Sequence, residues 1–331
     1  MQIYFHELPP SQEPYVKEAL KDHTFTFSSH SLVEAGVNPE TEVLCIFVHC
    51  KITPEVLEKL PKLKLICTMS TGFDHVDVKA CAEKGVTVCN VPFYGGHSVA
   101  EHAFALLLAL SRKIPQSIIH LRKKKFVLDE LKGFDLSGKT LGVLGAGHIG
   151  QYTAKIAKGF DMNVIAYDVF PNQQIAQQIG FSFVDLPTLL STSDIISVHA
   201  PYNQYTHHTI NMQNIHQVKK GCTFINTARG GLIETKALHL ALEEGLFSGA
   251  GLDVLEEEDL FLKPGRAKGA TQEQKEILRM NKEILGMPHV LFTPHNAFNT
   301  IEAEQRIVEM TMKNIQSYLG GGAINTVKPI E

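Results

Sequence analysis

The sequence predicts an α/β protein with two doubly wound parallel sheets, and three observations lead to this prediction. Short runs of large apolar and β-branched residues alternate with amphipathic segments along most of the chain, which is typical of parallel strands joined by helices. This alternation stops once, at residues 92–98, where FYGGHS has no regular period. The chain has 331 residues, and at about 150 residues per domain that length fits two domains. We therefore expect one sheet on each side of the interruption.

The first series of elements is short. Apolar runs predict four strands, QIYFH, EVLCIFVHC, LKLICTMS and GVTVCNVP, over residues 2–6, 42–50, 63–70 and 85–92. Two amphipathic segments between them, PEVLEKL and VDVKACAEKG, predict helices over 54–60 and 76–85. These elements form the smaller of the two predicted domains.

A second and longer series follows a helix predicted over 99–112. The basic stretch at 122–125 is interpreted as the solvated face of a helix. Seven strands are then predicted, over residues 140–145, 163–168, 181–185, 194–200, 222–227, 249–254 and 289–295. A last amphipathic helix begins near Thr300, and we expect it to return to the first domain. The predicted domains are therefore 1–98 with 297–331, and 99–296.

Composition and charge argue against several classes of protein. Basic residues number 31 and acidic residues 35, a net charge of −4, so neither nucleic acid nor an anionic membrane is favoured as a partner. The longest apolar run, residues 103–110, is far shorter than the roughly 20 residues of a membrane span. The N-terminus lacks the pattern of a secretory signal. The six cysteines contain no CxxC pair, and we expect them to be buried and reduced. A cytoplasmic protein without a metal site is expected.

The segment LGVLGAGHIG contains a glycine pattern, G-x-G-x-x-G, between a predicted strand and a predicted helix. Gly145 permits a tight turn, Gly147 lets the backbone approach a pyrophosphate, and Gly150 lets the helix pack closely on the strand. Taken alone, the pattern also fits a plain tight turn. Asp168 ends the next strand, 18 residues after Gly150, where a carboxylate accepts hydrogen bonds from a ribose. The alternative is a surface aspartate that caps a turn. Because no Arg or Lys occurs from 169 to 176, the expected cofactor is NAD rather than NADP.

Polar residues follow three of the later strands. Hydride transfer requires a group that moves a proton, usually His, and a cation that holds an anionic substrate. The strand ends supply Arg229, Asp253, a run of three glutamates at 256–258, and His295. Taken singly, these residues fit a surface ion pair, a solvated acidic run and an ordinary loop histidine. Together they predict an acid–base site, in which a glutamate stabilises the imidazolium of His295. The remaining histidines, such as His199, His207 and His208, have no comparable context.

The motifs STGFDHVD, NVPFYGGHSVAEHA, LGVLGAGHIG, NTARGGLIET, GAGLDVLEEEDLF and TPHNAF occur in this order along the chain. With them, the chain resembles the NAD-dependent D-isomer-specific 2-hydroxyacid dehydrogenases over essentially its whole length. The resemblance implies that Arg229 binds the substrate carboxylate and carbonyl oxygen. It implies that His295 is the acid and base, and that its partner is Glu258 rather than Glu256 or Glu257. Tyr94 would be an aromatic residue facing the substrate.

The resemblance also implies binding residues. The backbone amides of Ser70, Thr71 and Gly72 would grip the substrate carboxylate, and Asp253 would hold the nicotinamide carboxamide. The implied cofactor-binding residues are Gly145, Gly147, His148, Ile149, Gly150, Asp168, Ala200, Pro201, Thr206, Thr227, Ala228, Arg229 and Asp253. The implied substrate-binding residues are Ser70, Thr71, Gly72, Tyr94, Arg229 and Phe298.

The implied fold is a Rossmann-type NAD domain inserted into a smaller, flavodoxin-like catalytic domain, with the two around a cleft. Within the family the chain most resembles the fermentative D-lactate dehydrogenases, through EEEDLFLKPGRAKG and CIFVHC; Phe47 and Phe298 would narrow an apolar pocket. The sequence GGH at 95–97 departs from that branch.

The expected activity is reversible NADH-dependent reduction of pyruvate to D-lactate. The alternatives are a larger 2-oxo acid, or an NAD-sensing binding protein like the C-terminal-binding corepressors. A homodimer or higher homo-oligomer is expected, through the helix over 99–110 and the arm to Phe134, unless these are buried as core.

Overall fold

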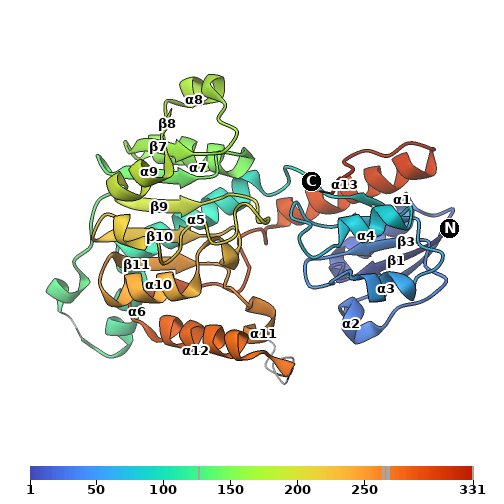
Figure 1. Cartoon of the computed structure of the whole chain (residues 1–331), viewed down its shortest axis with the longest axis horizontal. Helices are drawn as coiled ribbons and strands as arrows, with labels where there is room; N and C mark the ends of the chain where they lie inside the picture. The colour runs from blue at the N-terminus through green and yellow to red at the C-terminus, as the bar shows by residue number, and fades with distance from the viewer. Residues whose placement is uncertain (126, 263–264, 266–268, 330–331) are drawn as a thin grey trace. The chain divides into compact units, whose positions relative to one another are not determined.

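The computed structural model describes residues 1–125, 127–262, 265 and 269–329. Part of the motif EEEDLFLKPGRAKG (263–264 and 266–268) and the last two residues of the predicted segment 297–331 lie outside the described residues. The chain forms two compact units, Met1–Gly95 with Asn299–Glu331 (unit 1) and Gly96–Phe298 (unit 2). Each unit contains one parallel sheet (Figure 1). The predicted class, α/β with two parallel sheets, is confirmed.

Unit 1 contains a five-stranded sheet in the order β2-β1-β3-β4-β5. This is the flavodoxin-like order. Its strands are β1 (Gln2–His6), β2 (Thr24–Ser28), β3 (Val43–Ile46), β4 (Leu65–Thr68) and β5 (Thr87–Cys89). Its helices are η1 (Pro10–Gln12), α1 (Glu13–Ala19), α2 (Leu32–Ala35), α3 (Pro54–Glu58), α4 (Val78–Glu83) and α13 (Ile301–Leu319). Helix α13 packs on β4 and α1, so the C-terminal helix does return to the first sheet.

One strand of unit 1 was missed by sequence reasoning. β2 has the sequence TFTFS, in which Phe25 and Phe27 alternate with more exposed polar residues. It is an edge strand that pairs only with β1 among the strands of unit 1. Because an edge strand of this kind buries only one set of side chains, it lacks the continuous apolar run that identified the other strands.

Unit 2 contains a seven-stranded parallel sheet in the order β12-β11-β10-β9-β6-β7-β8, which is the doubly wound nucleotide-binding order with one added strand. Its strands are β6 (Thr140–Leu144), β7 (Asn163–Tyr167), β8 (Ser182–Phe183), β9 (Ile195–Val198), β10 (Cys222–Asn226), β11 (Phe247–Leu252) and β12 (Val290–Phe292). Six of them lie within the predicted runs, and β11 begins two residues before the predicted run 249–254. The helices are α5 (Gly96–Ser111), α6 (Ile114–Arg122), η2 (Leu128–Leu131), α7 (His148–Gly159), α8 (Gln173–Ile179), α9 (Leu186–Thr192), η3 (Ile215–Gln217), η4 (Gly230–Leu232), α10 (Thr235–Glu243), α11 (Glu258–Leu262) and α12 (Gln272–Gly286).

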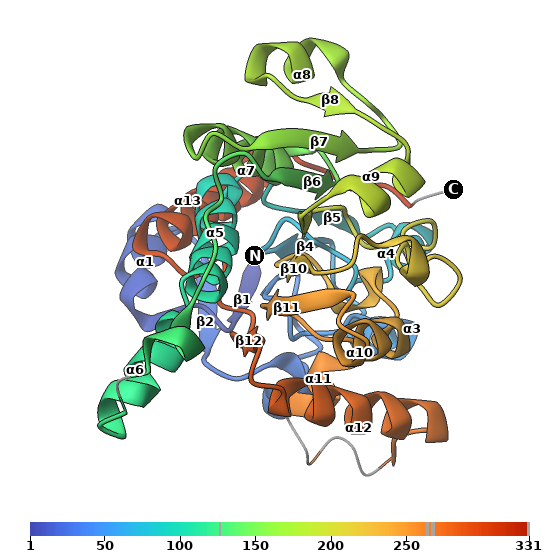
Figure 2. The same ribbon diagram turned by 90° about the vertical axis from the view of Figure 1, so that its left-hand side faces the viewer.

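Separate apolar cores lie on the two faces of this sheet. α5 and α7 contribute to one core and α9 and α10 to the other, and Figure 2 shows α5 and α10 on opposite sides of the sheet. Helix α5 begins at Gly96, three residues before the predicted start, and most of its side chains are buried in its own unit. Most apolar residues of α5 are therefore core residues. No helix in the described part of the chain is both long and apolar enough to cross a membrane.

Candidate active site

The glycine loop joins β6 to α7, and the structure explains two of its glycines by packing. Gly145 has φ of +93°, and a Cβ there would lie 2.4 Å from the backbone nitrogen of Ala200. A Cβ on Gly150 would lie 2.1 Å from the carbonyl oxygen of Gly145. A larger residue at Gly150 would push α7 away from the end of β6. A larger residue at Gly145 would collide with the backbone that follows β9 and would be strained by the positive φ.

Gly147 differs, because no atom lies within 4 Å of the place where its Cβ would be. It is the N-cap of α7, a 12-residue helix that presents unsatisfied N–H groups at this end. His148 and Ile149 are the first two residues of the helix, and burial lowers the pKa of His148, with nearby His97 and Lys155 acting in the same direction. A cradle of backbone N–H groups with open space beside it fits a pyrophosphate.

Asp168 follows β7 directly and accepts two backbone hydrogen bonds. Its Oδ2 accepts from the Ala146 amide at 2.8 Å and its Oδ1 from the Phe170 amide at 2.9 Å. The carboxylate is thus held against the glycine loop, and each oxygen keeps capacity for a second donor such as a ribose hydroxyl. Its role in ribose binding stays a prediction.

The ends of β9 and β10 supply the remaining predicted cofactor residues. Ala200 is buried, and the hydroxyl of Thr206 donates to the carbonyl of Pro201 at 2.6 Å, which closes the loop after β9. The Ala228 amide donates to Asn226 at 3.0 Å. Thr227 is buried, yet its hydroxyl has no hydrogen-bond partner in the described structure. Because such groups are almost always satisfied, this hydroxyl fits a ligand that supplies the missing partner.

The predicted acid–base residues come from three neighbouring strand ends, since β10, β11 and β12 are adjacent in the sheet. Arg229 lies in the turn after β10, where its Nη1 donates to the carbonyl of Ala228 at 2.9 Å. The side chain of Asn226 donates to the carbonyl of Arg229 at 2.9 Å and fixes the turn. The five N–H groups of a guanidinium match a carboxylate in a bidentate way.

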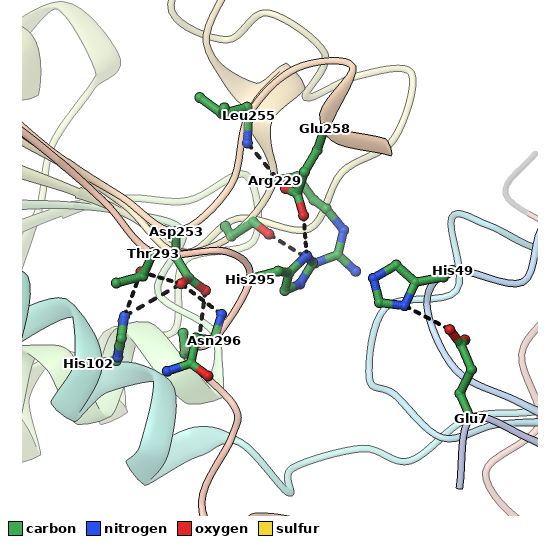
Figure 3. A network of polar contacts seen from close by, with 12 residues as sticks. Glu7, His49, His102, Arg229, Asp253, Leu255, Glu258, Thr293, His295 and Asn296 are labelled. Atoms are coloured by element: carbon green, nitrogen blue, oxygen red, sulfur yellow. Dashed lines mark hydrogen bonds and ion pairs between the residues drawn. The ribbon is translucent and has the colours of Figure 1, made fainter. Parts of the chain in front are cut away.

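His295 lies after β12, and its ring is held by Glu258. The Nδ1 atom is 3.0 Å from Oε1 of Glu258, whose Oε2 accepts from the Leu255 amide at 3.2 Å (Figure 3). His295 has φ of +52°, an uncommon conformation for a residue with a side chain. Its ring centroid is 6.5 Å from that of Phe298. Because Nδ1 is hydrogen-bonded to Glu258, the other ring nitrogen, Nε2, is the one that can bond a substrate oxygen.

Asp253 is fully buried and anchors the loop that carries His295. Its carboxylate accepts from the amides of Asn296 and Ala297, both at 2.8 Å, and from the hydroxyl of Thr293 (Figure 3). Its carbonyl accepts from the His295 amide at 2.9 Å. A contact between Asp253 and a nicotinamide carboxamide stays a prediction.

Sequence reasoning missed His102 of α5, whose Nε2 lies 2.9 Å from the Thr293 hydroxyl and 3.5 Å from Asp253 (Figure 3). The contact could not be predicted from local sequence, because His102 and Thr293 are 191 residues apart. The only indication of a role for His102 was its place in the motif AEHA.

The predicted substrate residues of unit 1 follow β4 and β5. The hydroxyls of Ser70 and Thr71 donate to the carbonyls of Gly72 and Val91 at 2.7 and 2.8 Å, and Asn90 donates to the Thr71 carbonyl at 2.8 Å. Within the described residues the amides of Thr71 and Gly72 donate to no protein acceptor. The loop thus presents N–H groups while its carbonyls are occupied, which suits an anion.

Tyr94 is held through its carbonyl by Nε of Arg306, on α13, at 2.9 Å. A pair that sequence reasoning missed lies at the carboxyl ends of β1 and β3. There Nδ1 of His49 is 3.1 Å from Glu7 (Figure 3), and the ring of Phe47 is 6.2 Å from that of His49. No local pattern indicates this pair, because its two residues are 42 positions apart in the chain.

The interpretation of the other histidines was wrong for His208. Its Nε2 lies 2.7 Å from Oε1 of Glu256. Two of the three consecutive glutamates therefore each contact a histidine. No group of three His, Cys, Asp or Glu in the described part of the chain could hold a metal ion.

Comparison with known proteins agrees with this geometry. The profile of the family described as D-isomer specific 2-hydroxyacid dehydrogenase, NAD binding domain, matches residues 104–297. The chain belongs to this family. It is 38% identical to D-lactate dehydrogenase of Escherichia coli over 83% of both chains, and 35% identical to glyoxylate reductase of Thermococcus litoralis over 85% of this chain and 82% of that one. The crystal structure of D-lactate dehydrogenase from Aquifex aeolicus, complexed with NAD and lactic acid, aligns with a TM-score of 0.90 at 36% identity, covering 99% of this chain and 100% of that one.

Membership in the family accounts for the expected cofactor and class of reaction. The protein is an NAD-dependent D-2-hydroxyacid dehydrogenase, as the motifs indicated. The residues of the glycine loop, the open space at Gly147 and the unpaired hydroxyl of Thr227 all fit NAD. Relatives of similar identity carry names of different substrates, so family membership alone does not select one 2-oxo acid.

Proposed function

We propose that the protein is a D-lactate dehydrogenase that reduces pyruvate to D-lactate with NADH and catalyses the reverse reaction. The observation that carries the proposal is the hydrogen bond of 3.0 Å between His295, which follows β12, and Glu258, which follows β11. Arg229 follows β10, the strand on the other side of β11. An acid–base group and a cation at the same edge of the sheet supply what a 2-oxo acid requires.

In the direction of reduction, NADH supplies the hydride. The guanidinium of Arg229 binds the carboxylate of the 2-oxo acid and polarises its carbonyl. The imidazolium of His295 donates the proton on Nε2 to the carbonyl oxygen as that oxygen gains charge. The Nδ1–H remains hydrogen-bonded to Glu258, which disfavours rotation of the ring and stabilises its protonated form. In oxidation the same nitrogen takes the proton back.

We propose that residues 70–72 and Tyr94 of unit 1 contribute to substrate binding, the loop through the amides of Thr71 and Gly72. Phe298, whose ring lies 6.5 Å from that of His295, and Phe47 are proposed to restrict the side chain of the substrate to methyl size. Because one methylene changes binding by only about 1–3 kcal/mol, a larger 2-oxo acid is the alternative substrate.

We also infer a cytoplasmic homodimer. All six cysteines are free and buried, which suits a reducing compartment. Ile114, Ile118 and Leu121 of α6 are 47%, 47% and 64% exposed, and Leu128 beyond it is 82% exposed. An apolar surface of this kind is typical of contact with a second copy of the chain. Sedimentation of the wild type and of I118E tests this, since the dimer should dissociate in the variant; a monomeric wild type would refute it.

The deciding experiment follows NADH oxidation with pyruvate, 2-oxobutyrate, 2-oxoisocaproate, glyoxylate and hydroxypyruvate, and analyses the product on a chiral column. We expect the highest kcat/KM with pyruvate and D-lactate as the product. A higher kcat/KM with a larger 2-oxo acid would identify that acid, rather than pyruvate, as the preferred substrate. Tight NADH binding without turnover of any 2-oxo acid would favour an NAD-sensing binding protein.

A further inference from the structure

The run of three glutamates after β11 contains two residues with separate partners. Glu258 contacts His295, whereas Glu256 contacts His208 in the loop after β9. Glu257 has φ of +54°, so the backbone turns sharply between them. Within the described residues Glu257 makes no side-chain hydrogen bond or ion pair. We propose that Glu256 is a positioning residue that holds the loop at 201–208 in the conformation that binds NAD.

The carboxylate of Glu256 connects two segments. Its Oε1 lies 2.7 Å from Nε2 of His208, and its Oε2 accepts from the hydroxyl and the amide of Thr235 at 2.6 and 3.1 Å. Thr235 is the first residue of α10, where the helix favours a negative charge. The side chain of Glu256 is 14% exposed, so these bonds are shielded from water and from screening.

The backbone of the same residue is also fixed. The buried side chain of Asn281, on α12, donates to the Glu256 carbonyl at 2.8 Å. A Cβ on Gly230 would lie 1.9 Å from the carbonyl carbon of Leu255 and 2.1 Å from the nitrogen of Glu256. The turn that carries Arg229 therefore packs directly against this segment. Glu256 is thus held through both its side chain and its backbone, and the loop after β9 is the segment that it would restrain.

His208 adopts a conformation that its contact explains. It has φ of +51°, which is unfavourable for a residue with a side chain, while its amide donates to the Gly231 carbonyl at 2.8 Å. With the backbone in this conformation, the ring of His208 contacts Glu256 and stacks on the ring of His207, with a centroid distance of 3.7 Å. The ring of His207 in turn bonds the hydroxyl of Tyr202 at 3.0 Å.

The restraint extends to the predicted cofactor residues through the loop itself. The hydroxyl of Thr206, two residues before His208, donates to the Pro201 carbonyl at 2.6 Å and accepts from the Asn203 amide at 2.9 Å. The loop is closed on itself, so its position depends on how it is attached to the rest of unit 2. The Glu256–His208 pair is one such attachment. Loosening it should weaken NAD binding without removing any group that moves a proton.

The test is a double-mutant cycle on NADH binding with E256Q, H208N and both together. Asn tolerates a positive φ and is too short to reach Glu256, so H208N removes the contact without adding backbone strain. The dissociation constant is measured by the fluorescence of NADH, excited in the absorption band of its dihydronicotinamide ring. We expect each single variant to raise the NADH dissociation constant about tenfold, and the double variant to raise it no further. E257Q is the matched control and should leave it unchanged.

Two further measurements separate positioning from general stability. In the cofactor-free protein, the amides of residues 202–209 should exchange hydrogen faster in E256Q than in E257Q. At saturating NADH, kcat with the preferred 2-oxo acid should fall less than about threefold. An unchanged NADH dissociation constant with a lowered melting temperature would overturn the proposal, as would additive effects in the double variant. NADH binding needs no substrate, so failure of the assignment to pyruvate would leave this result interpretable.

Discussion

Glu258 holds the ring of His295 through a single hydrogen bond of 3.0 Å to Nδ1, and Glu258 is itself held by the Leu255 amide. The imidazole is therefore oriented before a substrate binds. Because general acids contribute about 10²–10⁴ to rate, we expect H295Q to lower kcat by a factor in that range. NADH binding, measured by fluorescence, should not change. Turnover close to that of the wild type would remove His295 from proton transfer.

The orienting role of Glu258 predicts a smaller loss in E258Q. The amide keeps a hydrogen-bonding group at the same place but removes the negative charge that stabilises the imidazolium. We expect kcat to fall by about tenfold to a hundredfold, because the ring loses the charged partner that orients it during proton transfer. Steady-state kinetics of E258Q and E257Q measure this. Equal kcat in the two variants would contradict the assignment of Glu258.

Arg229 is expected to bind a carboxylate through two parallel N–H bonds. R229K keeps the charge but cannot form both bonds. Since a hydrogen bond to a charged group contributes about 1.5–3 kcal/mol, KM for the 2-oxo acid should rise about tenfold to a hundredfold. Steady-state kinetics at saturating NADH measure this. A KM equal to that of the wild type would show that another cation binds the substrate.

The open space beside Gly147 leads to a prediction that separates folding from binding. A methyl group there would meet no protein atom, and φ of −67° suits Ala, so G147A should keep the melting temperature of the wild type. The same methyl group would occupy the place expected for the pyrophosphate, and the NADH dissociation constant should rise at least about tenfold. G159A, in the same helix and with equally open surroundings, should bind NADH normally. Normal binding by G147A would place the pyrophosphate elsewhere.

Asp168 predicts the choice between the two nicotinamide cofactors. D168N keeps an oxygen that accepts from the Ala146 amide but removes the charge that repels a 2′-phosphate. The ratio of kcat/KM for NADH to that for NADPH should fall about tenfold or more. An unchanged ratio would exclude Asp168 from this choice.

His199 predicts a dependence of stability on pH. It is buried between β9 and α7, where its Nε2 lies 2.8 Å from Ser197 and 3.1 Å from Thr153, and burial lowers its pKa from 6.5 to about 3. Below pH 6.5 the unfolded chain binds the proton and the folded chain does not. The contribution of this residue is therefore complete above pH 6.5. It is lost as pH falls toward 3, on the order of 5 kcal/mol in total. Urea unfolding from pH 7 to 4 should lose stability more steeply in the wild type than in H199Q; parallel curves would refute this.

Local sequence was sufficient to predict the strands of unit 2 and the glycine loop. The central strands β9 and β10 are buried at every residue, so they appear as continuous apolar runs. The role of Gly150 depends on Gly145, a neighbour within one strand–turn–helix unit. β2 could not be found in this way, because an edge strand alternates polar and apolar residues.

Residue types at strand ends also indicated an Arg, a His and a glutamate, but their pairing could not be derived from them. The chemistry of three consecutive glutamates is identical, and Glu258 was selected only through resemblance to a family. In the structure the backbone turns at Glu257, and the turn directs Glu256 to His208 and Glu258 to His295. The contacts of His102 with Thr293 and of His49 with Glu7 likewise join segments that are distant in the chain.

The sequence by itself therefore determined the class of fold, the cofactor loop and the kinds of group at the strand ends, because these depend on periodicity and on steric limits within a few residues. Only the tertiary structure decided which histidine each glutamate holds and which residues anchor the loop of His295. Those pairings depend on the order of β9 to β12 in the sheet and on the directions of the turns that follow them, and neither property is local.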